Sequence, residues 1–269
     1  MRGLVFLTSL LVCSAICADS RLSNDPATVV PLAQAHAHND YLHERPLLDA
    51  LSHGFCSVEA DIFLANDELQ IGHFRFQLKQ GRTLQKLYLD PLRQRIKKNG
   101  GTVYKDSKIP FTLLIDLKTG DSTYQELHKV LSNYGEMLTR VEDGKQKPGA
   151  VSVIISGNRP MKQIAQSNPR FCGIDGRLSD LKTDKPAHLM PLISDNWRSH
   201  FKWRGNGPMP AVEKTKLHDS VKQAHAAGRR VRFWATPENE AVWKELHAAK
   251  VDMLNTDQLK RLQNFLTAQ

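Results

Sequence analysis

The chain repeats one pattern of hydrophobicity, in which short apolar runs rich in β-branched and aromatic residues alternate with segments of helical period. Eight such runs occur, at residues 31–38, 55–63, 111–117, 150–156, 171–175, 189–194, 230–235 and 251–255. Strands that alternate with helices form βα units and lie parallel in one sheet. Eight is the strand number at which such a sheet closes, so the pattern predicts an α/β fold of the TIM-type (β/α)8 barrel class.

The N-terminal segment has a different composition. Residues 4–17 are an apolar run behind one positive residue, Arg2, which predicts a secretory signal over residues 1–18 and a secreted or periplasmic mature chain. A membrane anchor is the alternative, but the run is shorter than the roughly 20 apolar residues that a span needs. Its cysteines follow bulky residues, which makes lipid attachment a minor alternative. We therefore expect one barrel domain over residues 19–269, with no transmembrane segment after signal removal.

Charge and cysteine content narrow the class of partner. The formal net charge of +9 produces a positive field that favours an anionic substrate such as a phosphodiester, although a basic surface fits solubility equally well. We expect a monomer with no specific nucleic-acid partner.

Outside the N-terminal segment only Cys56 and Cys172 remain, both in apolar runs. Two such cysteines predict buried thiols rather than a disulfide framework.

Polar residues occur in pairs, two positions apart, near the ends of the first three predicted strands. The pairs are His36/His38, Glu59/Asp61 and Asp116/Lys118. Side chains two apart on a strand point to the same side, and the strand ends of a barrel converge on one mouth. Carboxylates buried together are costly without a cation, and three oxygen donors favour Mg²⁺ or Ca²⁺ over zinc. The spacing predicts Glu59, Asp61 and Asp116 as ligands of one divalent cation, with Lys118 beside them as a fixed positive charge for a phosphate oxygen.

Two histidines are suited to proton transfer at this site. His73 ends a short strand that contains Leu69, and the adjoining Gly72 leaves room for a ligand. Together with His38 it predicts acid–base catalysis across a scissile phosphodiester, with one imidazole deprotonating the nucleophile and the other protonating the leaving oxygen. We expect His36 to be a packed residue beneath His38.

The order of these residues resembles the PLC-like phosphodiesterase superfamily, which includes the glycerophosphodiester phosphodiesterases. The shared pattern is a first catalytic histidine, a Glu-x-Asp metal pair, a second catalytic histidine, and an acidic ligand two residues before a lysine. The segment AHAHNDYLHERPLLDALSHGFCSVEADIFLANDELQIGH is closest to the branch that includes altered inheritance of mitochondria protein 6, and VRFWAT and VDMLNTD resemble the superfamily's last two strands. The resemblance implies a phosphoric diester hydrolase with His38 and His73 as acid and base and with Mg²⁺ or Ca²⁺ as cofactor.

The chain also departs from the glycerophosphodiesterases. They have Arg-Gly after the first histidine and a Pro-Glu-Asn-Thr run, whereas this chain has Asn39-Asp40 and, at residues 45–48, RPLL. The resemblance therefore implies diesterase chemistry on a phospholipid-derived or glycerophosphodiester-like substrate without specifying which. Residues that follow predicted strands should line the mouth and contact the substrate; they are Asn39, Arg159, Arg177 and Trp234. Each of the two arginines is equally suited to an ion pair.

Two other functions fit parts of the pattern. His36-Ala37-His38 is also an H-x-H motif, as in metal hydrolases of the amidohydrolase or polymerase-histidinol-phosphatase kind. Those enzymes need further histidines on the middle strands, whereas the predicted fifth and sixth strands end in Asp175 and Asp195. A non-catalytic barrel that binds lipid or carbohydrate through its tryptophans is the other alternative, and it leaves the acid–base and metal set unexplained.

The longest connection between predicted barrel strands covers residues 66–110. It is predicted to contain a short strand at residues 68–73, a helix at 84–98 and a basic turn at 97–101. A long insertion after a barrel strand usually lies over the active-site face, where we expect this one. An ordinary surface loop fits the lysines of the turn equally well.

Overall fold

A computed structural model describes residues 29–269, and all eight predicted strands are present in it. They are β1 (Leu32–Ala37), β2 (Phe55–Ala65), β4 (Phe111–Leu117), β7 (Val151–Gly157), β8 (Cys172–Gly176), β9 (Leu192–Asn196), β10 (Arg230–Trp234) and β11 (Leu254–Thr256). The predicted secretory signal lies outside the described residues.

The eight strands form one parallel sheet that curves into a nearly closed barrel. Their order in the sheet is β10-β9-β8-β7-β4-β2-β1-β11. The two end strands meet at a single parallel bridge between Arg232 and Met253, where the backbone N–H groups of Asp252 and Met253 donate to the Val231 carbonyl at 3.1 and 3.2 Å. The predicted (β/α)8 class is therefore confirmed.

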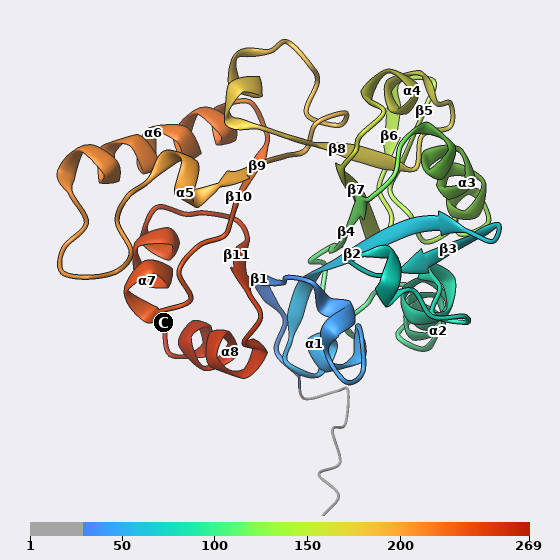
Figure 1. Cartoon of the computed structure of the whole chain (residues 1–269), viewed down its shortest axis with the longest axis horizontal. Coiled ribbons are helices and arrows are strands. Elements are labelled where there is room, and N and C mark those ends of the chain that lie inside the picture. Colours follow the sequence, from blue (N-terminus) through green and yellow to red (C-terminus); the bar gives the residue numbers. More distant parts are fainter. Residues whose placement is uncertain (1–28) are drawn as a thin grey trace, which may run out of the picture.

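Helices surround the strands on the outside of the barrel, as Figure 1 shows. They are α1 (Leu48–Ser52), α2 (Asp90–Lys98), α3 (Asp121–Ser132), α4 (Met161–Gln166), α5 (Trp197–His200), α6 (Ala211–Ala226), α7 (Glu240–Ala248) and α8 (Leu259–Thr267). Large side chains such as Trp197 and Trp243 are fully buried between helices and sheet. Cys56 and Cys172 are free and buried, as predicted. No helix within residues 29–269 is long and apolar enough to cross a bilayer.

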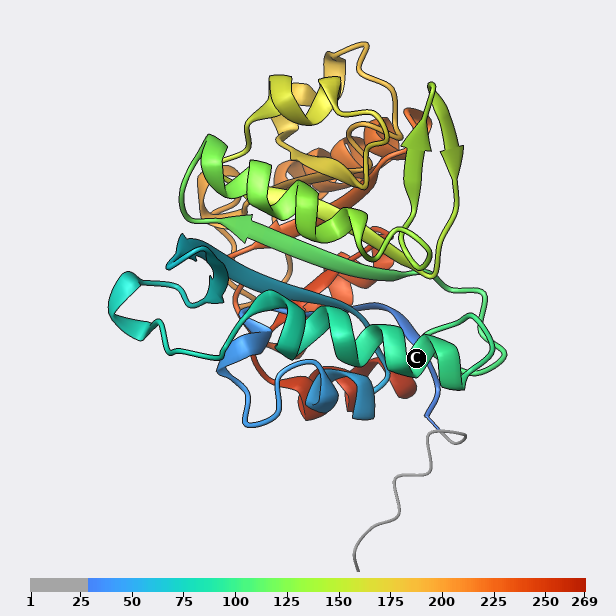
Figure 2. The same cartoon turned by 90° about the vertical axis from the view of Figure 1, so that its right-hand side faces the viewer.

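The insertion between β2 and β4 divides into two parts. Its first part is β3 (Glu68–Ile71), which pairs antiparallel with the end of β2, followed by the short helices η2 (Arg75–Gln77) and η3 (Gln85–Leu89). Figure 2 shows this part at the barrel mouth, whereas the C-terminal end of α2 lies at the opposite end, where β4 begins. The expectation that the insertion covers the active-site face is thus wrong for the basic turn at 97–101, because α2 is the helix that returns the chain to the start of β4.

A small hairpin, β5 (Arg140–Glu142) with β6 (Lys145–Lys147), is separate from the barrel sheet. Two further short 3-10 helices, η1 (Asp40–Leu42) and η4 (Leu178–Lys182), follow β1 and β8.

Candidate active site

The barrel interior changes from apolar to polar along the strands. Four interior side chains form an apolar cluster of their own: Leu114, Ile154, Leu192 and Met253. Two positions further along the same segments the residues are polar: Asp116, Ser156, Ser194 and Asn255. Because side chains two apart on a strand point to the same side, the polar group lies directly above the apolar one. It faces the carboxyl-end mouth, where barrels of this class place their chemistry.

The predicted metal ligands come together at this mouth. Glu59, Asp61 and Asp116 each offer a carboxylate oxygen, and these oxygens all lie within 4.8 Å of one another. The register of the parallel pair β2 and β4 places Asp61 directly beside Asp116. Burial raises the pKa of Asp116, and the charge of Lys118 opposes that rise without cancelling it. Carboxylates this close and this buried need positive charge among them.

The two oxygens of Asp61 have different surroundings. Oδ2 accepts a hydrogen bond from the Tyr41 hydroxyl at 2.8 Å and lies 2.8 Å from the Lys118 Nζ and 2.7 Å from the His73 Nδ1. Oδ1 is buried without any hydrogen-bond partner among the described residues. A buried polar atom without a partner is uncommon in folded proteins, and a carboxylate oxygen is a preferred ligand of Mg²⁺ and Ca²⁺. The donor set therefore fits a hard divalent cation.

Two fixed cations flank the carboxylates. The Lys118 Nζ lies 2.8 Å from Asp61 and 3.0 Å from Asp116; burial works to lower its pKa, but the two carboxylates outweigh it and raise that pKa. The buried Arg232 guanidinium donates to Glu59 Oε2 and, at 2.6 and 2.9 Å, to Asn255. Burial works to raise the pKa of Glu59, yet Arg232 holds it well below its usual range. Formally, three carboxylates and two cations leave a charge of minus one, and a divalent ion would make it plus one.

The two predicted catalytic histidines are each held by a carboxylate. His38 follows β1, and its Nδ1 lies 2.8 Å from Asp257 Oδ1. Burial works to lower the pKa of His38, but the hydrogen bond with Asp257 and the charge of Glu59 outweigh it, so the pKa is raised. His73 follows β3, and its Nδ1 lies beside Asp61 Oδ2. Each imidazole therefore uses Nδ1 for orientation and keeps Nε2 for a reacting group.

His36 is a packed residue, as predicted. It is fully buried, with Nδ1 2.7 Å from the Ser57 hydroxyl and Nε2 3.4 Å from Glu59 Oε2. Burial and the charge of Arg232 lower its pKa to about 3. Both nitrogens of His36 thus contact neighbours inside the barrel. Within residues 29–269 the one group of three or more potential ligands is the carboxylate triad, which contains neither histidine of the H-x-H motif.

The predicted substrate contacts divide into two kinds. Asn39 does lie at the site, with its amide nitrogen 3.3 Å from the His38 Nδ1, and Trp234 ends β10 on the same side as Arg232. Arg177 instead pairs with the fully buried Asp175 at 2.9 Å, and Arg159 donates to the main-chain oxygen of Asp175.

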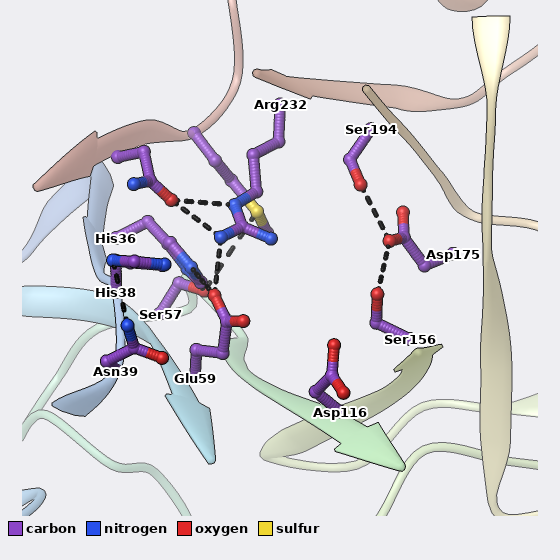
Figure 3. A network of polar contacts seen from close by, with 12 residues as sticks. His36, His38, Asn39, Ser57, Glu59, Asp116, Ser156, Asp175, Ser194 and Arg232 are labelled. Carbon is purple, nitrogen blue, oxygen red and sulfur yellow. Dashed lines mark hydrogen bonds and ion pairs between the residues drawn. The ribbon is translucent and has the colours of Figure 1, made fainter. Parts of the chain in front are cut away.

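Asp175 also accepts hydrogen bonds from Ser156 at 2.8 Å and from Ser194 at 2.6 Å. Figure 3 shows this second polar group, with Asp116 between it and the Glu59–Arg232 group. The structure therefore gives Arg177 the ion-pair role that the sequence left open.

Two site residues escaped the sequence analysis. Tyr41 lies three positions after His38, and nothing in the spacing indicates that its hydroxyl reaches Asp61. Arg232 precedes Trp234 by two positions in VRFWAT. The same alternation that identified the acidic pairs places it inside the barrel, so this signal was present.

Comparison with known proteins assigns the chain. Residues 24–173, more than half of the chain, match the family model described as the AIM6-like phosphodiesterase domain. The chain belongs to the AIM6-like phosphodiesterase family. A second match, over residues 230–260, is to the glycerophosphoryl diester phosphodiesterase family. The two matched segments contain every residue of the triad, both predicted catalytic histidines, Lys118 and Arg232. The resemblance to the PLC-like superfamily is confirmed.

Relatives of this AIM6-like chain include proteins named for the same family. The altered inheritance of mitochondria protein 6 homolog of Arthroderma benhamiae is 30% identical, over 88% of this chain and 84% of that protein. Altered inheritance of mitochondria protein 6 of Eremothecium gossypii is 28% identical, over 92% and 72%. Among solved structures, a glycerophosphodiester phosphodiesterase from Parabacteroides distasonis is similar with a TM-score of 0.54 at 15% identity, covering 87% of this chain and 97% of that one. This last likeness establishes the fold.

Proposed function

We propose that this AIM6-like protein is a metal-dependent phosphoric diester hydrolase in which His38 and His73 form the acid–base pair. The observation that carries the proposal is the triad of carboxylates within 4.8 Å of one another, with the buried Asp61 Oδ1 unpartnered. Two imidazoles oriented by carboxylates stand beside that triad. A triad of ligands together with two proton-transfer groups is more than a binding module requires.

Glu59, Asp61 and Asp116 would hold one Mg²⁺ or Ca²⁺. When bound, such an ion supplies positive charge to a phosphoryl oxygen and helps to orient the diester. Lys118 adds a second positive charge on the side of Asp61 and Asp116. Arg232 keeps Glu59 ionised from the barrel interior. These groups favour the transition state of phosphoryl transfer, in which charge spreads over the equatorial oxygens.

The histidines divide the proton transfers. One Nε2 takes the proton of the attacking hydroxyl, whether of water or of the substrate, and the other gives a proton to the leaving oxygen. Asp257 and Asp61 fix the ring orientations through Nδ1. Asn39 and Trp234 are proposed to contact a phospholipid-derived or glycerophosphodiester-like substrate.

The reaction is proposed to take place outside the cytoplasm, since residues 4–17 have the composition of a secretory signal. N-terminal sequencing of the exported protein should give a start after residues 13–20. Recovery of an intact Met1 from exported material would contradict this part of the proposal.

The acid–base assignment is tested by hydrolysis of a water-soluble glycerophosphodiester, whose alkoxide leaving group needs a proton, in the presence of Mg²⁺ or Ca²⁺. His38→Ala and His73→Ala should each lower the rate by about 10²–10⁴-fold. The double variant should lower it by far less than the product of the two single effects. His225→Ala is the matched control, because its Nε2 lies 2.8 Å from Asp252 in a histidine–carboxylate pair outside the site; this variant should retain the wild-type rate.

His36→Ala separates the diesterase from the H-x-H hydrolase. Because His36 is packed, His36→Ala should lower the activity less than His38→Ala does, and it should lower the stability more. A folded His36 variant as inactive as the His38 variant would refute the assignment and favour the amidohydrolase-like alternative.

A further inference from the structure

Apolar side chains project into solvent from the segment that follows the catalytic His73. Phe76 is 83% exposed and Phe74 is 51% exposed, and their rings stack with centroids 5.4 Å apart. Across a groove of about 420 Å³, Leu42 is 65% exposed at the end of the short helix η1 that follows His38. Figure 2 shows the connection between β3 and α2 projecting beyond the strand ends. Exposed apolar groups clustered at one place on a surface indicate a site of interaction.

The same segment is uniformly basic. Residues 73–89 contain Arg75, Lys79, Arg82 and Lys86 and no aspartate or glutamate. Arg75, Lys79 and Lys86 are exposed, and none of the four cations forms an ion pair with a carboxylate of residues 29–269. Aromatic side chains at a projecting tip, flanked by unpaired cations, match the polarity of an anionic bilayer surface, with an apolar layer beneath a negatively charged one.

This segment is also joined to the catalytic groups. The Phe74 ring packs edge-on against the His73 imidazole, with centroids 4.5 Å apart. The Gln77 side chain accepts hydrogen bonds from the backbone N–H groups of His73 and Phe74 at 2.8 and 3.0 Å. Tyr41, which donates to Asp61, borders the same groove as Leu42 and Phe76. A surface that holds Phe76 therefore lies next to the barrel mouth.

We propose that residues 74–82 and Leu42 dock onto an anionic phospholipid bilayer, and that the diester cleaved at the mouth is a phospholipid headgroup presented by that bilayer. The substrate class rests on the proposed diesterase function, whereas the docking does not. The Phe76 and Leu42 side chains enter the acyl boundary, the cations meet the lipid phosphates, and the groove leads from the bilayer to the mouth.

Co-sedimentation with lipid vesicles tests the docking without any turnover. The full chain should sediment with vesicles of equal parts phosphatidylcholine and phosphatidylglycerol and much less with phosphatidylcholine alone. Phe76→Ser should weaken the partition by about tenfold or more, from the lost burial of one phenyl group, and Lys79→Gln by roughly fivefold. Val212→Ser, at a side chain 82% exposed on α6, is the matched control and should not change it. Thermal melting checks that each variant is folded.

Several results would overturn the docking. One is a wild-type chain that stays in solution with anionic vesicles; another is a Phe76 variant that partitions like the Val212 variant. A concentration-dependent dimer in sedimentation velocity that Phe76→Ser abolishes would assign the surface to a second copy of the chain instead. Turnover of a water-soluble diester without vesicles is measured separately, so a chain that binds vesicles but cleaves no diester refutes the enzymatic proposal and leaves the docking intact.

Discussion

Replacing Arg232 with methionine removes one half of a buried ion pair and leaves Glu59 without its counter-charge. Arg232 and Glu59 are 2% and 7% exposed, and breaking a buried pair from one side costs about 3–5 kcal/mol. For a domain of this size the melting temperature in EDTA should fall by roughly 6–20 °C. Mg²⁺ or Ca²⁺ should restore part of the lost stability, because a cation bound by the triad replaces the positive counter-charge that Arg232 gave to Glu59.

The contribution of Glu59 to the pH dependence of stability should also have the opposite sign in Arg232→Met. In the wild type the pKa of Glu59 is depressed, so its contribution to the free energy of unfolding is present above the ordinary glutamate range and is lost as the pH falls. Without Arg232 burial dominates and raises that pKa. In the variant, the contribution of Glu59 to the free energy of unfolding is fully present at low pH and is lost as the pH rises above the ordinary glutamate range.

Calorimetry of three variants separates this explanation from simple loss of packing. Arg229→Met is the matched control, because Arg229 is equally buried but donates only to the main-chain oxygens of residues 180, 183 and 185. It should be destabilised without a larger response to divalent ions than the wild type. Adding Glu59→Gln to Arg232→Met should recover stability in EDTA, since no buried charge is then left unpaired. The reasoning would be refuted if Arg232→Met were as stable as the wild type in EDTA, or if divalent ions stabilised it no more than they stabilise the wild type.

Two further predictions concern the site geometry. Gly157 has a φ of +69°, and a Cβ there would lie 2.4 Å from Asp116 Oδ1; Gly157→Ala should weaken divalent-ion binding by at least about tenfold, measured by titration calorimetry. Gly144→Ala, at a φ of +74° with open space around it, should bind ions normally, and equal effects would contradict the steric argument. Asp257→Asn should lower the pKa of His38 and move one limb of the pH–rate profile to lower pH: the basic limb if His38 is the acid, the acidic limb if it is the base. A profile with both limbs unmoved would show that this contact does not tune catalysis.

The fold and the convergence of the three carboxylates could be predicted from the sequence because both depend on strand alternation. A strand that contains Glu-x-Asp must point both side chains to one side, and the parallel register then brings Asp116 beside Asp61. The helical part of the insertion could not be placed, since length alone does not distinguish a lid from the ordinary helix that returns the chain to β4.

The sequence also could not show which side chains contact one another at the site. Arg177 contacts Asp175 because Ser156 and Ser194, on two flanking strands, hold that carboxylate in place. The Tyr41 hydroxyl reaches Asp61 through the path of the loop after β1. The two serine contacts and the tyrosine contact join residues 19 or 20 positions apart in the chain. They depend on which strands are neighbours in the sheet and on the path of a loop, and not on a local sequence pattern.

The rate of diester hydrolysis as a function of free Mg²⁺ or Ca²⁺ tests the central claim most directly. After dialysis against EDTA, the wild-type protein should have lost its hydrolysis of bis(p-nitrophenyl) phosphate, and added ion should restore the rate to a plateau. Asp61→Asn, which removes a charge from the oxygen left free for the ion, should require far more ion and reach a lower plateau. A wild-type rate that is unchanged in EDTA, or an Asp61→Asn variant with the same ion dependence as the wild type, would contradict a metal-dependent site at this triad.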